Sequence, residues 1–346
     1  MRRTKIIVSL GPATFEKDMI FKAAEAGMDI ARTNTSHQNH AWHSKVIERV
    51  RDVSSEIGKE IPIELDLQGP SVRTGDIMKN CDEKGFLHIK KGQKLILTVE
   101  NDGFGEKIFV NYPELLEMVE TGSKIFIDDA FVQLQVVDKK GYDIHCVSLN
   151  DSKLGSRRTL HIPGKSFNLP VLREKDWKDL EFAVRMDVDY VGISFVRTEK
   201  EILEVKEFLR DNACNAKVIA KIETPEALKN IDRIIKHTDA VMIARGDMGV
   251  VLPLETVPIH QYSIIKKCKE AGRFVITATE MLESMKNRPL PTRAEVNDVF
   301  SVVAAGTDAV MLSGETAEGN YPIESISFMQ RIVEHAENSP HRIIIS

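Results

Sequence analysis

The sequence is poor in cysteine and tryptophan and has no long apolar run. Four cysteines, Cys81, Cys146, Cys214 and Cys268, are scattered over 346 residues without a CxxC pair. This spacing is typical of free thiols in a reducing cytosol and argues against a disulfide scaffold. No apolar stretch reaches membrane-spanning length, and a formal net charge of −5 argues against binding to nucleic acid or a polyanionic membrane. We therefore expect a cytoplasmic globular protein, and composition alone indicates no function.

Eight short β-rich apolar runs recur along the chain, most of them separated by amphipathic helical stretches. The runs cover residues 5–10, 29–33, 62–67, 190–195, 217–223, 240–246, 274–279 and 309–314. Their spacing is usually the few dozen residues that a βα unit needs. Eight such units predict an α/β fold of the (β/α)8 TIM-barrel type, which needs about 250 residues.

The interval between the third and fourth runs breaks this alternation. Helical periodicity disappears from much of it, and turn sequences separate three strand-like segments, residues 86–99, 124–137 and 141–149. We predict a small all-β, barrel-like lid domain inserted after the third strand, because a domain leaving that end of a barrel can exclude water. The predicted boundaries are 1–74 and 163–346 for the barrel and 75–162 for the insertion.

Polar residues gather where the barrel strands end, the edge at which such barrels carry their chemistry. They are Arg32, Asn34, Ser36, Asp66, Ser194, Lys221, Glu223, Arg245, Gly246, Asp247, Thr279, Glu280, Ser313 and Glu315. One such residue alone is more often a salt bridge or a helix cap. A ring of charged and hydroxylic groups on several converging strands favours an active site.

Lys221 and Glu223 lie two residues apart in one strand, so their side chains point to the same face. An isolated KxE pair is usually a simple ion pair, but Asp247 adds a second carboxylate after the next strand. Two carboxylates suit Mg²⁺ or Mn²⁺, with water and substrate oxygens completing the shell. The pattern predicts a divalent-metal site at Glu223 and Asp247, which leaves Lys221 to meet an anionic substrate.

Two weaker signals flank this set. In ARGDMGV, Gly246 and Gly249 allow the backbone N–H groups to approach a carboxylate or phosphate, although a simple glycine turn gives the same pattern. His37, His40 and His43 are spaced three apart, without the further ligands that a zinc site needs. We expect a solvated or nucleotide-facing helix start there, with Ser36 as its N-cap.

Taken together, these residues make the chain similar to the pyruvate kinase family, from residue 1 to about residue 335. The matching blocks, in the order of the family, are RRTKIIVSLGPAT, GMDIARTNTSH, LDLQGPSVRTG, IPGKSFNLP, EKDWKDLEFA, GISFVR, IAKIE, ARGDMGV, ITATEMLESM, PTRAEVNDV and GTDAVMLSGETAEGNYP. The resemblance implies a barrel with a lid. It also implies the glycolytic transfer of a phosphoryl group from phosphoenolpyruvate to ADP, through an enolpyruvate that is protonated at C3.

The resemblance also implies a role for each matching residue. The catalytic residues would be Lys221, Thr279, Arg32 and Ser313. The substrate would be held by Arg32, Lys221, Gly246, Asp247, Thr279 and Ser194. The nucleotide would be held by Asn34, His37, Arg73 and Arg158. Mg²⁺ (or Mn²⁺) would be held by Glu223 and Asp247, and K⁺ by Asn34, Ser36, Asp66 and Leu67.

The departures from the family pattern concern the nucleotide and potassium side. Residues 66–73 are DLQGPSVR where the family usually has DTKGPEIR, so Ser71 replaces the glutamate linked to monovalent-cation dependence. Glu318 stands where a lysine is usual and Glu280 where a glutamine is usual. These changes leave K⁺ binding open and keep two alternatives open. One is a metal-dependent pyruvate-enolate enzyme of the aldolase or lyase type that uses no nucleotide, and the other is a ligand sensor without catalysis.

The resemblance carries an expectation about assembly as well. The family usually continues into a further α/β domain with effector binding and a subunit interface, whereas this sequence ends at RIIIS. We therefore expect no C-terminal regulatory domain and a homo-oligomer, with a dimer as the expected form.

Overall fold

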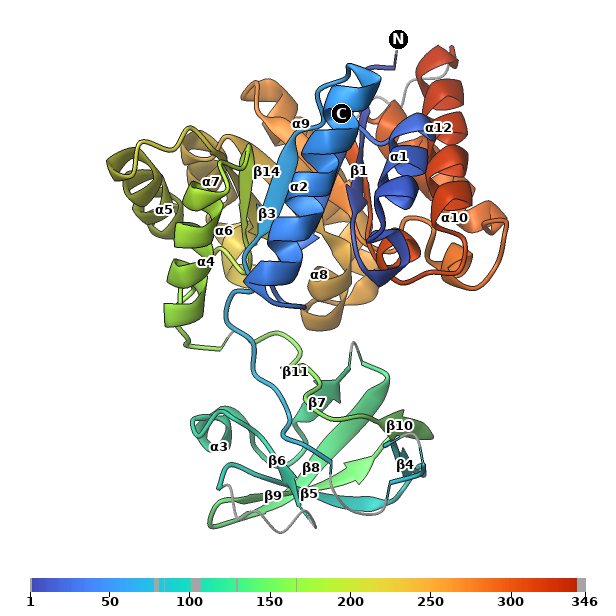
Figure 1. Cartoon of the computed structure of the whole chain (residues 1–346). Coiled ribbons are helices and arrows are strands. Elements are labelled where there is room, and N and C mark those ends of the chain that lie inside the picture. The colour runs from blue at the N-terminus through green and yellow to red at the C-terminus, as the bar shows by residue number, and fades with distance from the viewer. Residues whose placement is uncertain are drawn as a thin grey trace. The chain divides into compact units, whose positions relative to one another are not determined.

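The computed structural model describes residues 2–77, 81–83, 85–100, 107–128, 130–165 and 167–340. The chain divides into two compact units (Figure 1). The first consists of Met1–Pro70, Pro170–Gly246 and Glu255–Ser346, and the second of Ser71–Leu169 and Asp247–Leu254.

The first unit contains a closed barrel of eight parallel strands, which confirms the predicted TIM-barrel fold. The strands are β1 (Lys5–Ser9), β2 (Ile30–Asn34), β3 (Ile63–Asp66), β12 (Tyr190–Ile193), β13 (Lys217–Ile222), β14 (Ala240–Ala244), β15 (Phe274–Ala278) and β16 (Ala309–Leu312). Their order around the barrel is β1-β16-β15-β14-β13-β12-β3-β2. Each strand lies within one of the eight apolar runs, except that β2 extends one residue beyond its run, to Asn34. The agreement arises because a strand buried on both faces is apolar without alternation.

Helices follow the strands and surround the barrel (Figure 1). The longer ones are α1 (Lys17–Glu25), α2 (His40–Ile57), α4 (Glu174–Arg185), α5 (Glu199–Asp211), α7 (Ile231–His237), α9 (Val257–Glu270), α10 (Arg293–Ala304) and α12 (Pro322–Asn338). Shorter ones are α6 (Pro225–Lys229), α8 (Arg245–Val251) and α11 (Gly314–Ala317). Thr198 with Glu201, and Thr292 with Glu295, form capping boxes that fix the starts of α5 and α10.

The start of α2 corrects one prediction. Ser36 was expected to cap this helix, but the helix begins at His40 and the Asn39 side chain accepts the Trp42 N–H at 3.0 Å. Gln38 has φ = 61°, so the chain turns between Ser36 and the helix. A serine four residues before the first helical residue, and on the other side of that turn, cannot reach the first helical N–H groups, and Asn39 is the N-cap.

The second unit is the predicted all-β insertion. It contains a six-stranded sheet in the order β11-β7-β8-β9-β5-β6 and a two-stranded sheet β10-β4. The strands are β4 (Leu87–Ile89), β5 (Lys94–Thr98), β6 (Ile108–Phe109), β7 (Lys124–Ile127), β8 (Val132–Lys140), β9 (Asp143–Ser148), β10 (Ser152–Leu154) and β11 (Leu160–His161). A short helix, α3 (Leu115–Met118), was not expected. Buried aliphatic side chains such as Leu97, Ile125 and Leu134 form a core separate from that of the barrel.

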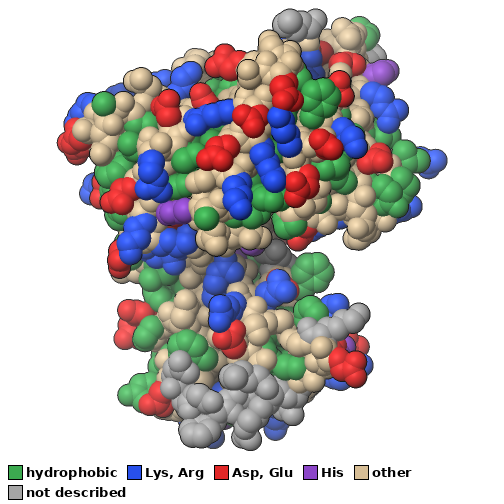
Figure 2. Space-filling model, in the orientation of Figure 1, with side chains coloured by type: hydrophobic (Ala, Val, Ile, Leu, Met, Phe, Trp, Pro, Cys, Tyr) green, Lys and Arg blue, Asp and Glu red, His purple; other side chains and the backbone are tan. Residues whose placement is uncertain are grey.

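The surface carries no large field of one sign on the face shown in Figure 2, where acidic and basic side chains are interspersed. Within the part of the chain that the structure describes, no helix is long and apolar enough to cross a membrane.

Candidate active site

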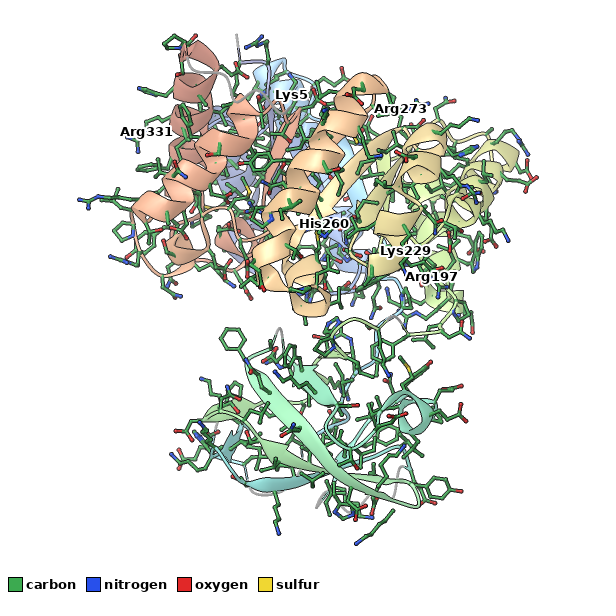
Figure 3. All side chains as sticks on the ribbon, turned by 180° about the vertical axis from the view of Figure 1, so that it is seen from behind. Lys5, Arg197, Lys229, His260, Arg273 and Arg331 are labelled. Atoms are coloured by element: carbon green, nitrogen blue, oxygen red, sulfur yellow. The ribbon has the colours of Figure 1, made fainter. Side chains whose placement is uncertain are left out.

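The carboxyl ends of the barrel strands lie at one edge of the first unit. In Figure 3, Lys5 and Arg273 mark the starts of β1 and β15 at one edge, whereas Arg197 and Lys229 lie at the opposite edge, beyond the ends of β12 and β13. The residues predicted from strand ends therefore share one edge of the barrel.

Lys221 lies at the centre of a buried polar cluster at this edge. It points from β13 into the barrel with 8% of its surface exposed. Its ammonium group donates to Ser194 Oγ at 2.7 Å and lies 3.2 Å from Asp66 Oδ2 and 3.1 Å from Glu223 Oε1. Because the charge is held in place by groups on three strands, it is available to a bound anion without reorganisation.

Arg32 forms the second positive centre of the cluster. Its guanidinium donates from Nε and Nη2 to Asp66 Oδ2, and from Nη1 to Ser9 Oγ at 2.7 Å. Burial alone would lower the pKa of Arg32, but the carboxylates of Asp66 and Glu64 outweigh it and raise the pKa. Three of the five N–H groups are used in these contacts, so the guanidinium keeps donors for a ligand.

Asp66 connects the two cations. It is fully buried on β3, and its register partner on β2 is Asn34. Burial would raise the pKa of Asp66, but the Arg32 guanidinium and the Lys221 ammonium hold it below the usual value. The lowered pKa favours the anionic form of Asp66, which orients both cations.

Glu64 was missed by the sequence analysis and lies in the same cluster. It sits two residues before Asp66 on β3, is fully buried, and its Oε1 lies 4.0 Å from Arg32 Nε. Burial first, and then the charge of Asp66, raise the pKa of Glu64 to about 8. If both groups are ionised, neither can donate a hydrogen bond to the other. If Glu64 is protonated, its O–H can donate to the Asp66 carboxylate. The missed signal was an acidic residue two positions before Asp66 in an apolar strand.

Glu223 and Ser194 are fixed by backbone contacts around this cluster. Glu223 Oε2 accepts the Phe195 N–H at 2.5 Å, and Phe195 holds a left-handed φ of 56°. Ser194 Oγ accepts from Lys221 and donates to the Leu67 carbonyl at 2.8 Å. The strand-end residues of β3, β12 and β13 thus form one network.

A second group forms around Thr279 at the end of β15. The Thr279 hydroxyl accepts the Gly246 N–H at 2.7 Å and donates to the Ala278 carbonyl at 2.6 Å. The residue has φ = 68°, an unusual conformation for a β-branched side chain. Arg245, which is itself paired with Asp298 at 2.6 Å, donates to the Thr279 carbonyl at 2.8 Å and supports this conformation. The partner Asp298 was also missed, since nothing in the pattern of α10 marks it.

Ser313 and its surroundings form a third group, after β16. The Ser313 backbone N–H donates to Glu315 Oε2 at 2.8 Å, and Glu315 also accepts the Leu282 N–H at 2.9 Å. Glu318, the acidic residue in place of the usual lysine, lies 3.0 Å from Lys286 Nζ. The reversed charge is thus paired with a lysine that Glu283 also contacts, at 3.1 Å.

The remaining predicted residues lie outside these groups. Asp247, in α8, belongs to the second unit together with Arg73 and Arg158. Arg73 donates to Ser71 Oγ at 3.0 Å, and Arg158 pairs with Asp128 at 3.4 Å.

The three histidines do not converge. His40 pairs with Asp179 at 2.7 Å, and the buried His43 pairs with Thr33 and with the His37 carbonyl. Among the residues with described placement, no group of three or more His, Cys, Asp or Glu side chains is arranged to hold a metal. Mg²⁺ is nevertheless commonly bound through one or two carboxylates.

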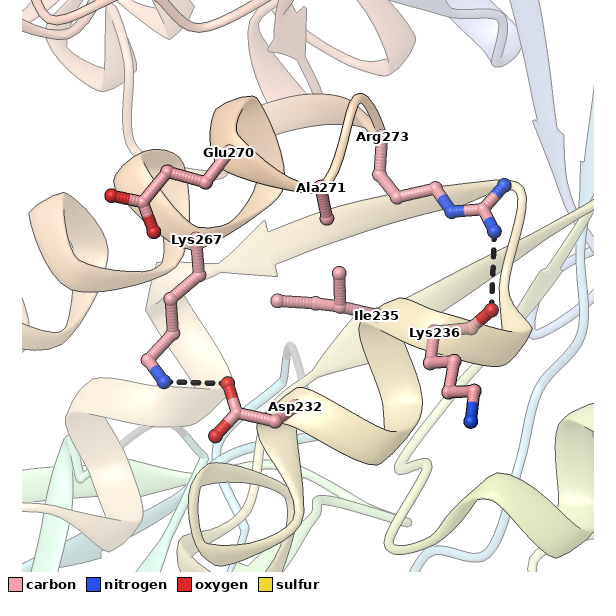
Figure 4. A pocket seen from close by; sticks show the side chains of 7 residues that line it. All are labelled: Asp232, Ile235, Lys236, Lys267, Glu270, Ala271 and Arg273. Atoms are coloured by element: carbon pink, nitrogen blue, oxygen red, sulfur yellow. Dashed lines mark hydrogen bonds and ion pairs between the residues drawn. The ribbon is translucent and has the colours of Figure 1, made fainter.

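A pocket of about 450 Å³ lies elsewhere on the barrel, between α7 and α9 (Figure 4). It is lined by Asp232, Ile235, Lys236, Lys267, Glu270, Ala271 and Arg273. Lys267 pairs with Asp232 at 2.5 Å, and Arg273 donates to the Lys236 carbonyl at 3.1 Å. Lys236 and Arg273 precede β14 and β15, so this pocket lies toward the opposite edge from the polar cluster, and none of the predicted site residues line it.

These features define a TIM-barrel protein with an inserted β-domain and a buried cation–carboxylate cluster where the strands end. The family profile described as pyruvate kinase, barrel domain, matches residues 1–326. Pyruvate kinase of Geobacillus stearothermophilus is 42% identical over 350 residues, which cover 100% of this chain and 59% of the relative. Pyruvate kinase of Staphylococcus haemolyticus is 42% identical over 341 residues, with 97% and 57% covered. The chain belongs to the pyruvate kinase family and spans 57–59% of the length of these relatives.

Proposed function

We propose that the protein transfers the phosphoryl group of phosphoenolpyruvate to ADP, giving pyruvate and ATP. The observation that carries the proposal is Lys221, a buried lysine held between Ser194, Asp66 and Glu223 at the ends of the barrel strands. A fixed ammonium in a site of low dielectric stabilises the charge that spreads over the transferred group in the transition state.

The other residues of the cluster would bind and orient the substrate. Arg32 would hold the phosphate with its remaining N–H donors, in the planar geometry that suits phosphate oxygens. The Gly246 N–H and the Thr279 hydroxyl, which contact each other in this structure, would instead hold the substrate carboxylate. Thr279 would then relay a proton to C3 through water and Ser313, because a threonine hydroxyl is by itself a poor acid.

Glu223 and Asp247 would hold Mg²⁺. The buried carboxylate of Glu223 is a hard oxygen donor fixed by the Phe195 N–H, which fits the preference of this ion. When bound, Mg²⁺ supplies positive charge that polarises the phosphoryl and enol oxygens.

Three of the oxygens expected to bind K⁺ already accept from protein donors. Asn34 Oδ1 accepts the Ser36 N–H at 2.9 Å, the Leu67 carbonyl accepts from Ser194, and Asp66 Oδ2 is paired with Arg32 and Lys221. Asp66 Oδ1 has no hydrogen-bond partner among the described residues, and a carbonyl oxygen keeps a second lone pair. K⁺ binding at Asn34, Ser36, Asp66 and Leu67 therefore remains a proposal, and we assign no step to K⁺. For the nucleotide side, Arg73 and Arg158 with Asn34 and His37 remain the proposed contacts.

The test is a rate measurement with phosphoenolpyruvate, ADP and Mg²⁺, with and without K⁺, in which pyruvate and ATP are followed separately. Equal amounts of pyruvate and ATP, formed only with Mg²⁺, would support the proposal.

A dimer and a cytoplasmic location remain predictions, and sedimentation that shows a tetramer would contradict the dimer.

A further inference from the structure

Glu64 is a buried acid for which the proposed reaction has no direct use. It is fully buried inside the barrel on β3, and neither of its oxygens has a hydrogen-bond donor among the described residues when Asp66 is ionised. A buried carboxyl group without a hydrogen-bond donor is costly even beside a cation such as Arg32 at 4.0 Å, and apolar residues occupy most positions of these strands. Its retention at this point needs a reason in the site itself.

The geometry beside Gly192 shows what Glu64 faces. A Cβ atom built on Gly192, the β12 register partner of Asp66, would lie 1.9 Å from Asp66 Oδ1 and 3.6 Å from Glu64 Oε1. The space left by the missing side chain is therefore filled by Asp66 Oδ1, and Glu64 Oε1 lies beside that space at van der Waals distance. Asp66 Oδ2 faces the cations, and Asp66 Oδ1 faces this space.

We propose that Glu64 is a positioning residue, which holds the Asp66 carboxylate in the rotamer that aligns Arg32 and Lys221 for the substrate phosphate. The proposal rests on the proposed function. Asp66 Oδ2 contacts both cations, so a rotation of this one carboxylate would displace both. Glu64 lies two residues before Asp66 on β3, farther from the carboxyl end of the strand, and does not need to touch the substrate.

The test compares Glu64→Leu with Glu64→Gln. Leucine is of similar size but removes the polar group beside Asp66, and we expect kcat/KM for phosphoenolpyruvate to fall about tenfold or more. Glutamine keeps an amide donor for Asp66 and should retain a larger part of kcat/KM. Replacing a buried carboxyl by an apolar group is often neutral or stabilising, so Glu64→Leu should unfold at the same temperature as the parent or higher.

A double-mutant cycle with Arg32→Lys shows whether Glu64 acts through Arg32. If it does, adding Glu64→Leu to Arg32→Lys should cost much less than adding it to the parent, since contacting residues are not additive. Asp179→Asn, a buried acid of α4 that pairs with His40 and Lys175, is the matched control and should leave kcat/KM unchanged.

The affinity of the parent and of each variant in the cycle for phosphoenolpyruvate is also measured by calorimetry, with Mg²⁺ and without nucleotide. This readout separates the two proposals, because it reports on Glu64 even if the parent makes no ATP. Parent-like phosphoenolpyruvate affinity and kcat/KM in Glu64→Leu, or equal losses in both backgrounds, would overturn the positioning role.

Discussion

At the scale of single residues, the chemistry depends on a few charges buried close together. Lys221 and Arg32 share Asp66 as their counter-ion, and Glu223 completes the pairing of Lys221. Each of these residues is at most 8% exposed, so solvent screens their interactions weakly. Changes to these residues should therefore act more strongly than changes to surface ion pairs.

Lys221→Met should reduce kcat by at least about 10²-fold, the usual effect of removing one transition-state contact. The substitution keeps an unbranched side chain one atom shorter and removes the charge, so Mg²⁺ binding at Glu223 should persist. Steady-state kinetics with Mn²⁺ binding measured in parallel would check both effects. Lys206→Met is the control, because it breaks the partly exposed pair between Lys206 on α5 and Asp239. Parent-like turnover in Lys221→Met would refute the assignment.

Glu64 should make the stability of the fold depend on pH. Its pKa is raised from 4.5 to about 8 in the folded state, so between these values the folded protein keeps a proton that the unfolded chain loses. The free energy of unfolding should then fall as pH rises through this window, by at most about 1.4 kcal/mol per pH unit. Denaturant unfolding at several pH values should show this slope in the parent and a flatter one in Glu64→Gln. Parallel slopes would contradict the raised pKa.

Glu318→Lys should strengthen ADP binding. The change removes one of the two acidic partners of Lys286, leaving Glu283 at 3.1 Å, and adds a second positive charge beside it. The Glu318 side chain is 65% exposed, so screening limits the gain to about 1 kcal/mol, or about fivefold in the Michaelis constant. Glu318→Gln separates the loss of the negative charge from the gain of the positive one. A Michaelis constant for ADP that is unchanged at low ionic strength would place residue 318 away from the nucleotide.

At the scale of elements, turns and caps decide where each strand-end residue points. The turn at Gln38 separates the end of β2 from the start of α2, and Asn39 caps that helix. A sequence pattern places a cap only to within a few residues, because serine and asparagine both suit the position. Ser36 was selected by type, but the left-handed turn that excludes it leaves no clear signal in the sequence.

Asn39→Ala should lower the free energy of unfolding by about 1 kcal/mol, since the N–H that it caps loses its acceptor. Ser36→Ala is the matched control and should change stability by less than half of that. Chemical denaturation of the two variants would measure the difference. A larger loss for Ser36→Ala would restore Ser36 as the cap.

At the scale of the whole molecule, the repeating pattern was the easiest feature to predict. Eight apolar runs defined the barrel strands, because strands buried on both faces contain few polar residues. The strands β6 and β11 have two residues each, which is too short to show an alternation of polar and apolar residues. The sequence therefore did not predict them as separate strands. Helix α3 is likewise too short for a helical period.

The sequence indicated which polar residues stand at the strand ends, but it did not indicate which side chains are in contact. Lys221, Glu223, Asp66, Arg32 and Ser194 share one network, as their positions at converging strands suggest. Ser9 joins that network because β1 and β3 both pair with β2, and Glu64 joins it because it lies two residues before Asp66 on β3 and shares its face. Such neighbours depend on register and inward orientation, which a single sequence does not specify.

The proposed activity is the transfer of a phosphoryl group to a nucleoside diphosphate. The most direct measurement follows phosphoenolpyruvate, ADP, pyruvate and ATP together by phosphorus and proton NMR, with Mg²⁺ present and then chelated. We predict that ATP and pyruvate appear at equal rates and that both stop on chelation. An absence of ATP, combined with Mg²⁺-dependent exchange of the pyruvate methyl protons, would contradict the claim and leave an enolising enzyme that uses no nucleotide.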